Sequence, residues 1–186
     1  MKKVKAIAFA LLVLSAATSH AQEKWFTRNG KINFFSKTTA ENIDANNNEV
    51  FSMIDPQKKE VAFQVLCTGF KFQKALMEEH FNENYMESTK YPKALFQGTI
   101  ADPSKIDFSK DGTYNVTVAG NLTMHGVTNK INIPATIVVA AGKISGESKF
   151  NIKLADYKIE IPSVVAKQIS ETVAVTVNCQ YEPFKR

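Results

Sequence analysis

The 186-residue chain carries 23 Lys and Arg residues against 18 Asp and Glu residues, a formal net charge of +5 at pH 7. Only Arg28 and Arg186 are arginines and no segment is densely basic, which argues against a nucleic-acid interface, because such interfaces cluster Lys and Arg on one face. The two cysteines and three histidines show no metal-ligand spacing, so we expect neither a metal nor a cofactor.

The first 21 residues have the layout of a secretory signal peptide. A lysine-rich start is followed by an apolar run over residues 6–17, and Ser19-His20-Ala21 supplies the small residues that a signal peptidase reads. The apolar run is shorter than the roughly 20 residues that span a bilayer. We therefore expect cleavage between Ala21 and Gln22, a periplasmic or secreted protein, and two parts: a signal peptide at 1–21 and one domain at 22–186.

Alternation of apolar and polar residues dominates the mature chain. Val61, Phe63, Val65 and Cys67 share one parity, for example, while the residues between them share the other. This period of two is typical of antiparallel strands with one covered face and one wet face. We expect strands at about residues 24–28, 30–38, 49–54, 60–70, 93–100, 113–122, 130–140, 143–154 and 171–181.

Turn-forming pairs separate these runs: Asn29-Gly30, Asp55-Pro56, Asp111-Gly112 and Ala141-Gly142. About eight short strands at regular spacing favour an all-β sandwich or a closed barrel. Closure has the physical advantage that it leaves no edge strand to aggregate. We therefore predict a single antiparallel β-barrel.

One segment departs from the period of two. Between residues 73 and 85, Leu76, Met77, Phe81 and Tyr85 recur at spacings typical of an amphipathic helix, with His80 at the edge of the apolar stripe. We expect this helix to cover one end of the barrel. An interfacial membrane helix is the alternative, and its acidic polar face argues against it.

The two cysteines, Cys67 and Cys179, both fall on the apolar parity of their predicted strands. An oxidising compartment would permit a disulfide, and the pairing depends on geometry that the sequence does not contain. We favour two buried thiols over a bridge.

Signatures of catalysis are sparse. The chain has no G-x-S-x-G elbow and no glycine-rich phosphate loop, and we interpret Asp156 and Glu160 as solvated charges. His125, beside Gly126, is expected to bond the main chain at a strand end, with a contact to a ligand head group as the alternative. We do not expect an enzyme.

Apolar volume is the main positive signal, since the chain contains 13 phenylalanines. A barrel of about eight strands either fills itself with side chains or holds a ligand. Strand-interior glycines such as Gly98, Gly120 and Gly146 can mark empty inner volume. Our candidates for an apolar cavity are Phe34, Val61, Phe63, Val65, Phe96, Gly98, Val116, Val118, Gly120, Leu122, Phe150, Val173, Val175 and Val177.

Several short segments, taken in order and spacing, resemble one family: residues 30–34, 79–88, 90–94, 96–98, 122–128 (LTMHGVT) and 156–159. This is the YceI-like, polyisoprenoid-binding family of secreted bacterial proteins, and the resemblance runs over residues 25–181. It implies an extended, up-and-down, lipocalin-like barrel with an elongated apolar pore. It also implies binding of long isoprenoid chains or other amphiphiles.

We therefore expect a lipid carrier or reservoir of the cell envelope whose partner is an apolar small molecule or lipid and not a nucleic acid. The expectation leaves room for transient membrane contact and for a homodimer. Two alternatives stay open. One is an enzyme that acts on an apolar substrate at the barrel mouth with His125 as base. The other is a structural or stress-response envelope protein whose core is simply full.

Overall fold

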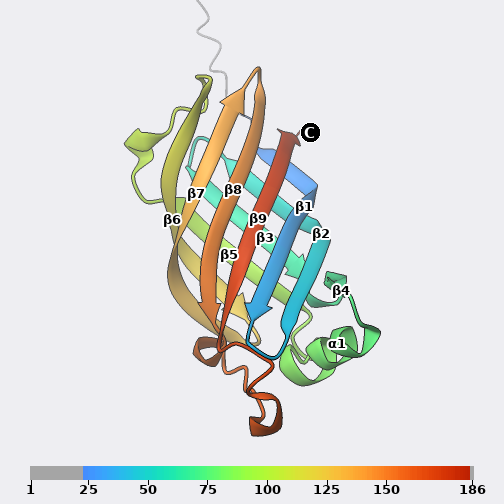
Figure 1. Cartoon of the computed structure of the whole chain (residues 1–186). Coiled ribbons are helices and arrows are strands. Elements are labelled where there is room, and N and C mark those ends of the chain that lie inside the picture. Colours follow the sequence, from blue (N-terminus) through green and yellow to red (C-terminus); the bar gives the residue numbers. More distant parts are fainter. Residues whose placement is uncertain (1–22, 185–186) are drawn as a thin grey trace, which may run out of the picture.

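A computed structural model describes residues 23–184 of the chain (Figure 1). The expected signal peptide and its cleavage site lie outside the described residues. The strands are β1 (Trp25–Lys37), β2 (Asn42–Asp55), β3 (Glu60–Leu66), β4 (Lys71–Phe72), β5 (Lys93–Ile100), β6 (Gly112–Met124), β7 (Val127–Ala140), β8 (Lys143–Lys153) and β9 (Thr172–Pro183). The single α-helix in the described part of the chain is α1 (Ala75–His80).

The strands close into one antiparallel barrel. Around the barrel the order is β1-β9-β8-β7-β6-β5-β3-β2, and β2 pairs again with β1. The two-residue β4 adds a short pairing to β2 and takes no part in the closure. Apart from β4, strands that follow one another in the chain are therefore neighbours in space, which confirms the predicted up-and-down, lipocalin-like barrel.

The Asn29-Gly30 pair does not form the predicted turn. β1 runs through it as one strand, and its register against β2 shifts on both sides of Gly30. A Cβ atom on Gly30 would lie 2.8 Å from the sulfur of Cys179 and 3.0 Å from the carbonyl oxygen of Val50. The glycine therefore serves a β-bulge in which two neighbouring strands approach closely.

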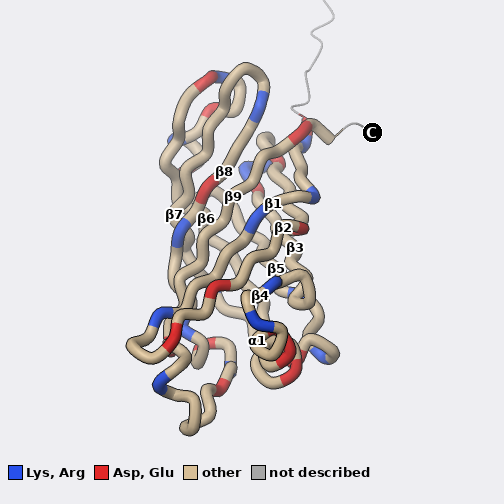
Figure 2. The backbone as a smooth tube through the Cα atoms, turned by 45° about the vertical axis from the view of Figure 1, so that its right-hand side comes forward, with Lys and Arg blue, Asp and Glu red and all other residues tan. Residues whose placement is uncertain are grey.

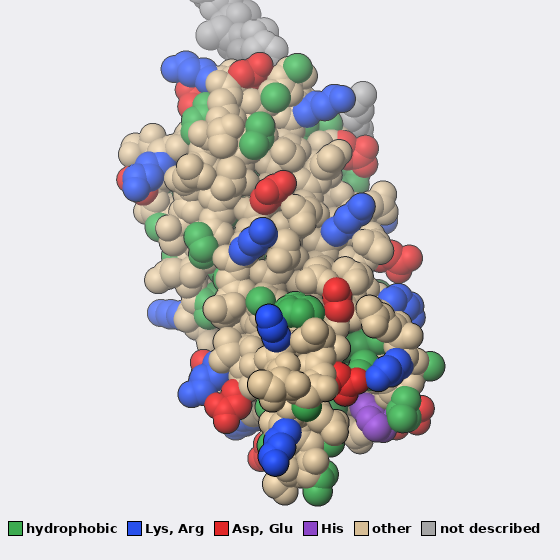
Figure 3. All heavy atoms as spheres, in the orientation of Figure 1, with side chains coloured by type: hydrophobic (Ala, Val, Ile, Leu, Met, Phe, Trp, Pro, Cys, Tyr) green, Lys and Arg blue, Asp and Glu red, His purple; other side chains and the backbone are tan. Residues whose placement is uncertain are grey.

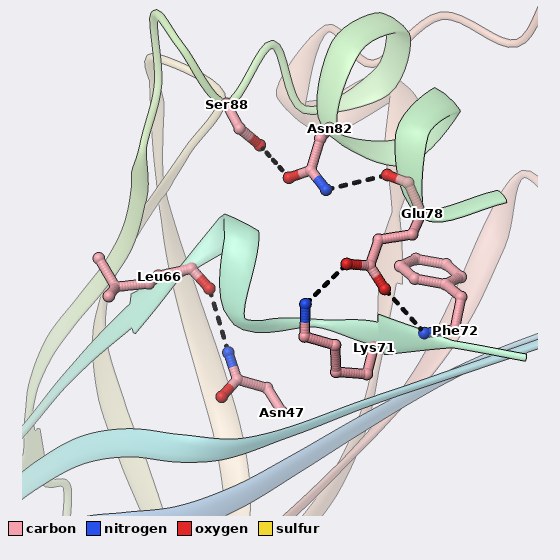
Figure 4. Close-up of polar contacts among 7 residues, drawn as sticks. All are labelled: Asn47, Leu66, Lys71, Phe72, Glu78, Asn82 and Ser88. Atoms are coloured by element: carbon pink, nitrogen blue, oxygen red, sulfur yellow. Dashed lines mark hydrogen bonds and ion pairs between the residues drawn. The ribbon is translucent and has the colours of Figure 1, made fainter. Parts of the chain in front are cut away.

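β2 begins at Asn42 and not at residue 49. Its first half was not predicted because it is rich in asparagine, a residue type that is depleted in strands. Asn47 is only 1% exposed and donates to the carbonyl of Leu66 at 3.0 Å (Figure 4). It also accepts from the amide of Glu49 at 2.9 Å. Its amide also occupies the space beside Gly69, where β3 has ended and a 3₁₀ turn (Cys67–Gly69) follows. The side-chain amide of Asn47, a residue type that disfavours strands, therefore has hydrogen-bond partners inside the barrel wall.

Two-residue turns join β6 to β7 and β7 to β8. His125-Gly126 and Ala141-Gly142 have positive φ angles at both positions, between 48° and 74°. This is the geometry of a type I′ hairpin turn, whose twist matches that of the flanking strands. The Ala141-Gly142 turn was predicted, whereas the His125-Gly126 turn lengthens the two predicted strands to Met124 and Val127.

Cys67 and Cys179 are both buried and free, as the favoured interpretation of two buried thiols expected. Burial raises the pKa of the Cys179 thiol to about 11 and also raises the pKa of Cys67. Because reactivity belongs to the thiolate, two protonated thiols behave as small apolar groups of the core.

The predicted helix over 73–85 divides into α1 and a π-helical turn (Phe81–Tyr85). Polar contacts connect α1 and the π-helical turn to β4 and to the segment that follows the turn (Figure 4). Glu78 pairs with Lys71 at 2.7 Å and accepts from the amide of Phe72, while Asn82 donates to the carbonyl of Glu78 and accepts from Ser88. The pair lies at the lower end of the barrel in Figure 1, where a helix was expected.

Within residues 23–184, no helix is both long enough and apolar enough to cross a membrane. Figure 2 shows Lys, Arg, Asp and Glu interspersed along the tube in that view, without a field of one sign.

Candidate functional site

An apolar cavity of about 250 Å³, the main cavity below, lies at the end of the barrel next to α1. Three sets of residues line it: inward side chains of the strands, the helical segment, and the loop that leads into β9. Strand residues on its wall include Ile32 and Val65, while Met77 and Tyr85 come from the helical segment and Ile169 from the loop. Ligand pockets in proteins are mostly apolar with few polar groups, and this lining has that character.

A second apolar cavity of about 110 Å³ lies deeper in the barrel. The two cavities share five lining residues, so they are adjacent and only side chains separate them. These are Ile32, Val65, Ala94, Leu122 and Phe150.

An aromatic cluster holds the wall of the main cavity together. Phe81, at the start of the π-helical turn, stacks on Phe34 of β1 with ring centroids 5.4 Å apart. Phe70 and Phe72 contact both rings, at centroid distances between 5.1 and 5.7 Å. Aromatic pairs of this kind add about 0.5–1.5 kcal/mol beyond the area they bury. The cluster therefore fixes the short helical segment, none of whose residues is fully buried.

A few polar side chains surround the mouth of the main cavity: Ser36, Glu41, His80 and Gln168. Glu41 pairs with Lys74 at 2.7 Å, and Ser36 accepts from the amide of Ser170 at 2.9 Å. The contacts link β1 and the connection from β1 to β2 to the segments that flank the mouth.

Apolar side chains are exposed at the same end of the molecule (Figure 3). Leu76 of α1 is 59% exposed and Val164, in the turn Ser163–Val165, is 87% exposed. Both belong to the segments that line the mouth. The opening into the apolar interior is therefore flanked by apolar groups in contact with solvent.

The structure brings most of the predicted cavity residues to the two cavities. Those at the main cavity are Phe34, Val65, Leu122, Phe150, Val173 and Val175. Those at the second cavity, besides the shared ones, are Val61, Phe63, Phe96, Val118 and Val177. Val116 is buried in the core but lines neither cavity.

Gly98 and Gly120 require a correction, because they do not mark empty volume. They face each other across β5 and β6, and the Phe96 ring lies over both, 2.8 Å from the position of a Cβ on either residue. A Cβ on Gly120 would also stand 2.4 Å from the carbonyl oxygen of Gln97. Only Gly146 of the three interior glycines has free space beside it, and it does line the second cavity.

His125 bonds the main chain, as the favoured interpretation expected. Its Nδ1 lies 3.0 Å from the carbonyl oxygen of Tyr157, its Nε2 lies 3.3 Å from a carboxylate oxygen of Glu87, and its ring contacts Tyr91. It lines neither apolar cavity. Its position joins the β6–β7 turn to the 3₁₀ turn Leu154–Tyr157 and gives no support to a role as base for a substrate inside the barrel.

Replacement of His125 by Ala should lower the free energy of unfolding by about 1–3 kcal/mol, because it leaves the Tyr157 carbonyl without its side-chain partner. Urea unfolding measures this loss. Ligand binding by the fraction that stays folded should match the parent protein. Unchanged stability together with lost binding would instead assign His125 a direct role at the ligand.

The sequence did not predict that the loop before β9 lines the mouth of the main cavity. Val165, Gln168 and Ile169 line the mouth, yet residues 158–171 show no periodicity that would place them there. Met77, Phe81 and Tyr85 stood on the predicted apolar stripe of the helix, and that stripe was the available signal for their place on the cavity wall.

Among residues 23–184, no three His, Cys, Asp or Glu side chains lie close enough together to hold a metal ion. The linings of the two cavities, which are mostly apolar, offer burial of apolar groups.

Comparison with solved structures places the fold among known barrels. A polyisoprenoid-binding domain from Saccharophagus degradans, implicated in plant cell wall breakdown, is similar with a TM-score of 0.74 at 18% identity, over 87% of this chain and 99% of that one. BcnA from Burkholderia cenocepacia is similar with a TM-score of 0.66 at 17% identity, over 82% and 96% of the two chains.

A YceI protein from Campylobacter jejuni is also similar, with a TM-score of 0.55 at 15% identity, over 100% of this chain and 92% of that one. No curated protein sequence matches the chain. The family model described as the YceI-like domain matches residues 13–181, nearly the whole chain. On that match, the protein belongs to the YceI-like domain family.

Proposed function

We propose that the barrel binds a hydrophobic chain, an isoprenoid or another amphiphilic lipid, and acts as a carrier or reservoir in the cell envelope. The observation that carries this proposal is the pair of adjacent apolar cavities along the inside of the barrel. The similarity to a polyisoprenoid-binding domain supports the isoprenoid as the class of chain. The signal-peptide pattern of residues 1–21 supports the envelope as the compartment.

Burial energetics suit a carrier. Each CH₂ group moved from water into an apolar site contributes about 0.8 kcal/mol, so a five-carbon isoprene unit contributes about 4 kcal/mol. A membrane offers the lipid nearly the same apolar environment as the cavity does. Exchange between protein and membrane is then close to neutral, which is what a protein that both loads and unloads requires.

The size of the cavities bears on chain length. The main cavity is somewhat smaller than the roughly 300–1,000 Å³ of typical ligand pockets. A long chain must also use the second cavity, and Leu122 and Phe150 stand on the wall that both share. We infer that these side chains change rotamer when a long chain enters.

Loading from a membrane would use the mouth. Leu76 and Val164 expose apolar surface on the two segments beside it, and such groups can enter the interfacial region of a bilayer. Transient membrane contact at this end would let a chain pass from lipid to cavity without crossing water.

Displacement of a fluorescent probe tests the proposal. N-phenyl-1-naphthylamine gains fluorescence in apolar sites, so the protein should raise its emission, and isoprenoid alcohols should displace it. We expect each added isoprene unit to strengthen displacement until the two cavities are full. A protein that neither raises the emission nor responds to the alcohols would have a closed core, and the binding proposal would be wrong.

A further inference from the structure

The ladder between β7 and β8 covers only part of the barrel wall. It runs from the turn at Ala140 and Lys143 to Ala135 and Ser148 and then stops. β7 nevertheless continues to pair with β6 as far as Val127, and β8 continues to pair with β9 as far as Lys153. Residues 127–134 therefore lie opposite residues 149–153, and no pairing between them is found in the described part of the chain. We call this unpaired stretch between β7 and β8 the seam.

Pro134 explains where the ladder ends. Its carbonyl oxygen accepts from the Ser148 hydroxyl at 2.6 Å, so it faces β8. The N and C=O groups of one strand residue point to the same side, and proline has no N–H to donate there. At the other end of the seam, the side chain of Asn129 donates to the carbonyl of Asp156 at 2.7 Å. The seam is thus a bounded opening with a defined end on each side.

A groove of about 340 Å³ lies over this seam. Its base consists of the inward residues Ile131, Ile133, Phe150 and Ile152. Phe150 lines this groove and both apolar cavities, while Ile133 and Ile152 each line the groove and one cavity, so these three side chains stand between the outer groove and the interior. A molecule with its chain inside the barrel can therefore place its polar end in the groove.

One buried polar group on the groove, the Tyr157 hydroxyl, has no acceptor in the described part of the chain. Tyr157 lines the groove, is only 3% exposed, and its hydroxyl has no hydrogen-bond partner among residues 23–184. The Asn129 amide lies beside the hydroxyl and donates to the carbonyl of Asp156; its other N–H can only donate to the hydroxyl oxygen, so the Tyr157 O–H itself has no acceptor among the described residues. A buried hydroxyl without a partner costs about 1–3 kcal/mol, which a ligand with an acceptor atom would recover.

The charge of the groove favours an anion. Lys130 and Lys153 line it, and neither forms an ion pair within the described part of the chain. Asp156 is the one carboxylate residue on the lining, and its main-chain carbonyl is engaged by Asn129. Two ammonium groups and the Tyr157 hydroxyl thus face a single carboxylate. The amides of Asn132 and Asn151 add further donors to the lining.

We propose that the groove between β7 and β8 binds the anionic head group of the amphiphile, a phosphate or a carboxylate, while its chain passes Phe150 into the barrel. This assignment rests on the proposed function, since it needs a chain in the apolar cavities. It places the head group at the side of the barrel and not at the mouth beside α1.

The test compares dodecyl phosphate with dodecanol, which has the same chain and no charge. In Lys153→Glu the Kd for dodecyl phosphate should rise about tenfold, while the Kd for dodecanol should stay within about twofold. In Tyr157→Phe the Kd for dodecyl phosphate should also rise about tenfold, because a hydrogen bond to a charged acceptor is lost. The melting temperature of Tyr157→Phe should stay the same or rise, since the hydroxyl has no protein partner to lose.

Two control variants locate the effect. Lys143→Glu makes the same charge change at the other end of β8 and should leave both affinities unchanged. Lys167→Glu makes it in the loop at the mouth and should do the same. If Lys167→Glu weakens dodecyl phosphate binding and the groove variants do not, the head group lies at the mouth and the groove assignment is wrong.

Failure of this inference can be told apart from failure of the proposed function. If the protein binds both amphiphiles and neither Lys153→Glu nor Tyr157→Phe changes the Kd, the proposed function stands and the groove is not the head-group site. A parent protein that binds neither amphiphile would overturn both.

Discussion

Replacement of Ala94 by Phe is expected to weaken binding of an isoprenoid alcohol by at least about tenfold and to leave the melting temperature unchanged or higher. Ala94 lines both apolar cavities, and its methyl group leaves room that an aromatic ring would fill. Filling a cavity restores lost apolar contacts at about 24 cal/mol per Å³. The new ring then occupies the volume that the ligand chain would otherwise fill.

Gln97→Phe is the matched control. Gln97 lies on the same strand with the opposite parity, is exposed and lines neither cavity, so the added ring stays outside the barrel. Probe displacement and thermal unfolding should both resemble the parent protein. If Ala94→Phe destabilised the fold strongly, or bound the alcohol as well as Gln97→Phe, the cavities would not be where the chain sits.

Replacement of Gly120 by Ala is expected to lower the free energy of unfolding by about 3 kcal/mol. The new Cβ would stand 2.4 Å from the carbonyl oxygen of Gln97 and 2.6 Å from the Cα of Gly98, so two strands must move apart. Overpacking costs about 1–3 kcal/mol, and more where main-chain atoms must shift. Urea unfolding of the variant and the parent gives the difference.

Gly146→Ala provides the comparison on the same inner face of the barrel. The nearest atom to a Cβ there belongs to Tyr181, at 3.6 Å, which is an ordinary contact distance. This variant should be neutral or more stable by about 0.4–1 kcal/mol, because alanine restricts the unfolded chain. Equal stability changes in the two variants would contradict the close approach of β5 and β6.

Much of the barrel was predictable because its strands have one dry face and one wet face. The series Val173, Val175 and Val177 alternates with Thr172, Ala174 and Thr176, and the structure buries the valines. The strand boundaries failed where tertiary packing overrides local preference. Gly30 resembles a turn but serves a bulge against Cys179, and Asn47 resembles a strand breaker but is satisfied by Leu66.

The candidate site was predictable only in part, for a physical reason. Parity tells which side chains point inward, but not whether their volumes fill the space they enclose. Gly120 points inward and is covered by the Phe96 ring, which belongs to the same face of the neighbouring strand. Val116 is equally inward and is buried in the core without lining either cavity. Cavities appear only once the volumes of all facing side chains are known.

The groove between β7 and β8 had no sequence signal of its own. Pro134 indicates a strand with one unpaired side, yet nothing local reveals that its neighbour there is β8. In the sequence, Tyr157 is distinguished only as part of a family motif, and its unpartnered hydroxyl is a property of the folded chain.

Native mass spectrometry of the protein purified from its own organism tests the central claim most directly. If the barrel carries a hydrophobic chain, the parent protein should show a bound lipid mass that collisional activation releases, and Ala94→Phe purified in the same way should not. Organic extraction should then identify the lipid. A parent protein that carries no lipid under these conditions, with the same mass as its polypeptide, would contradict the account.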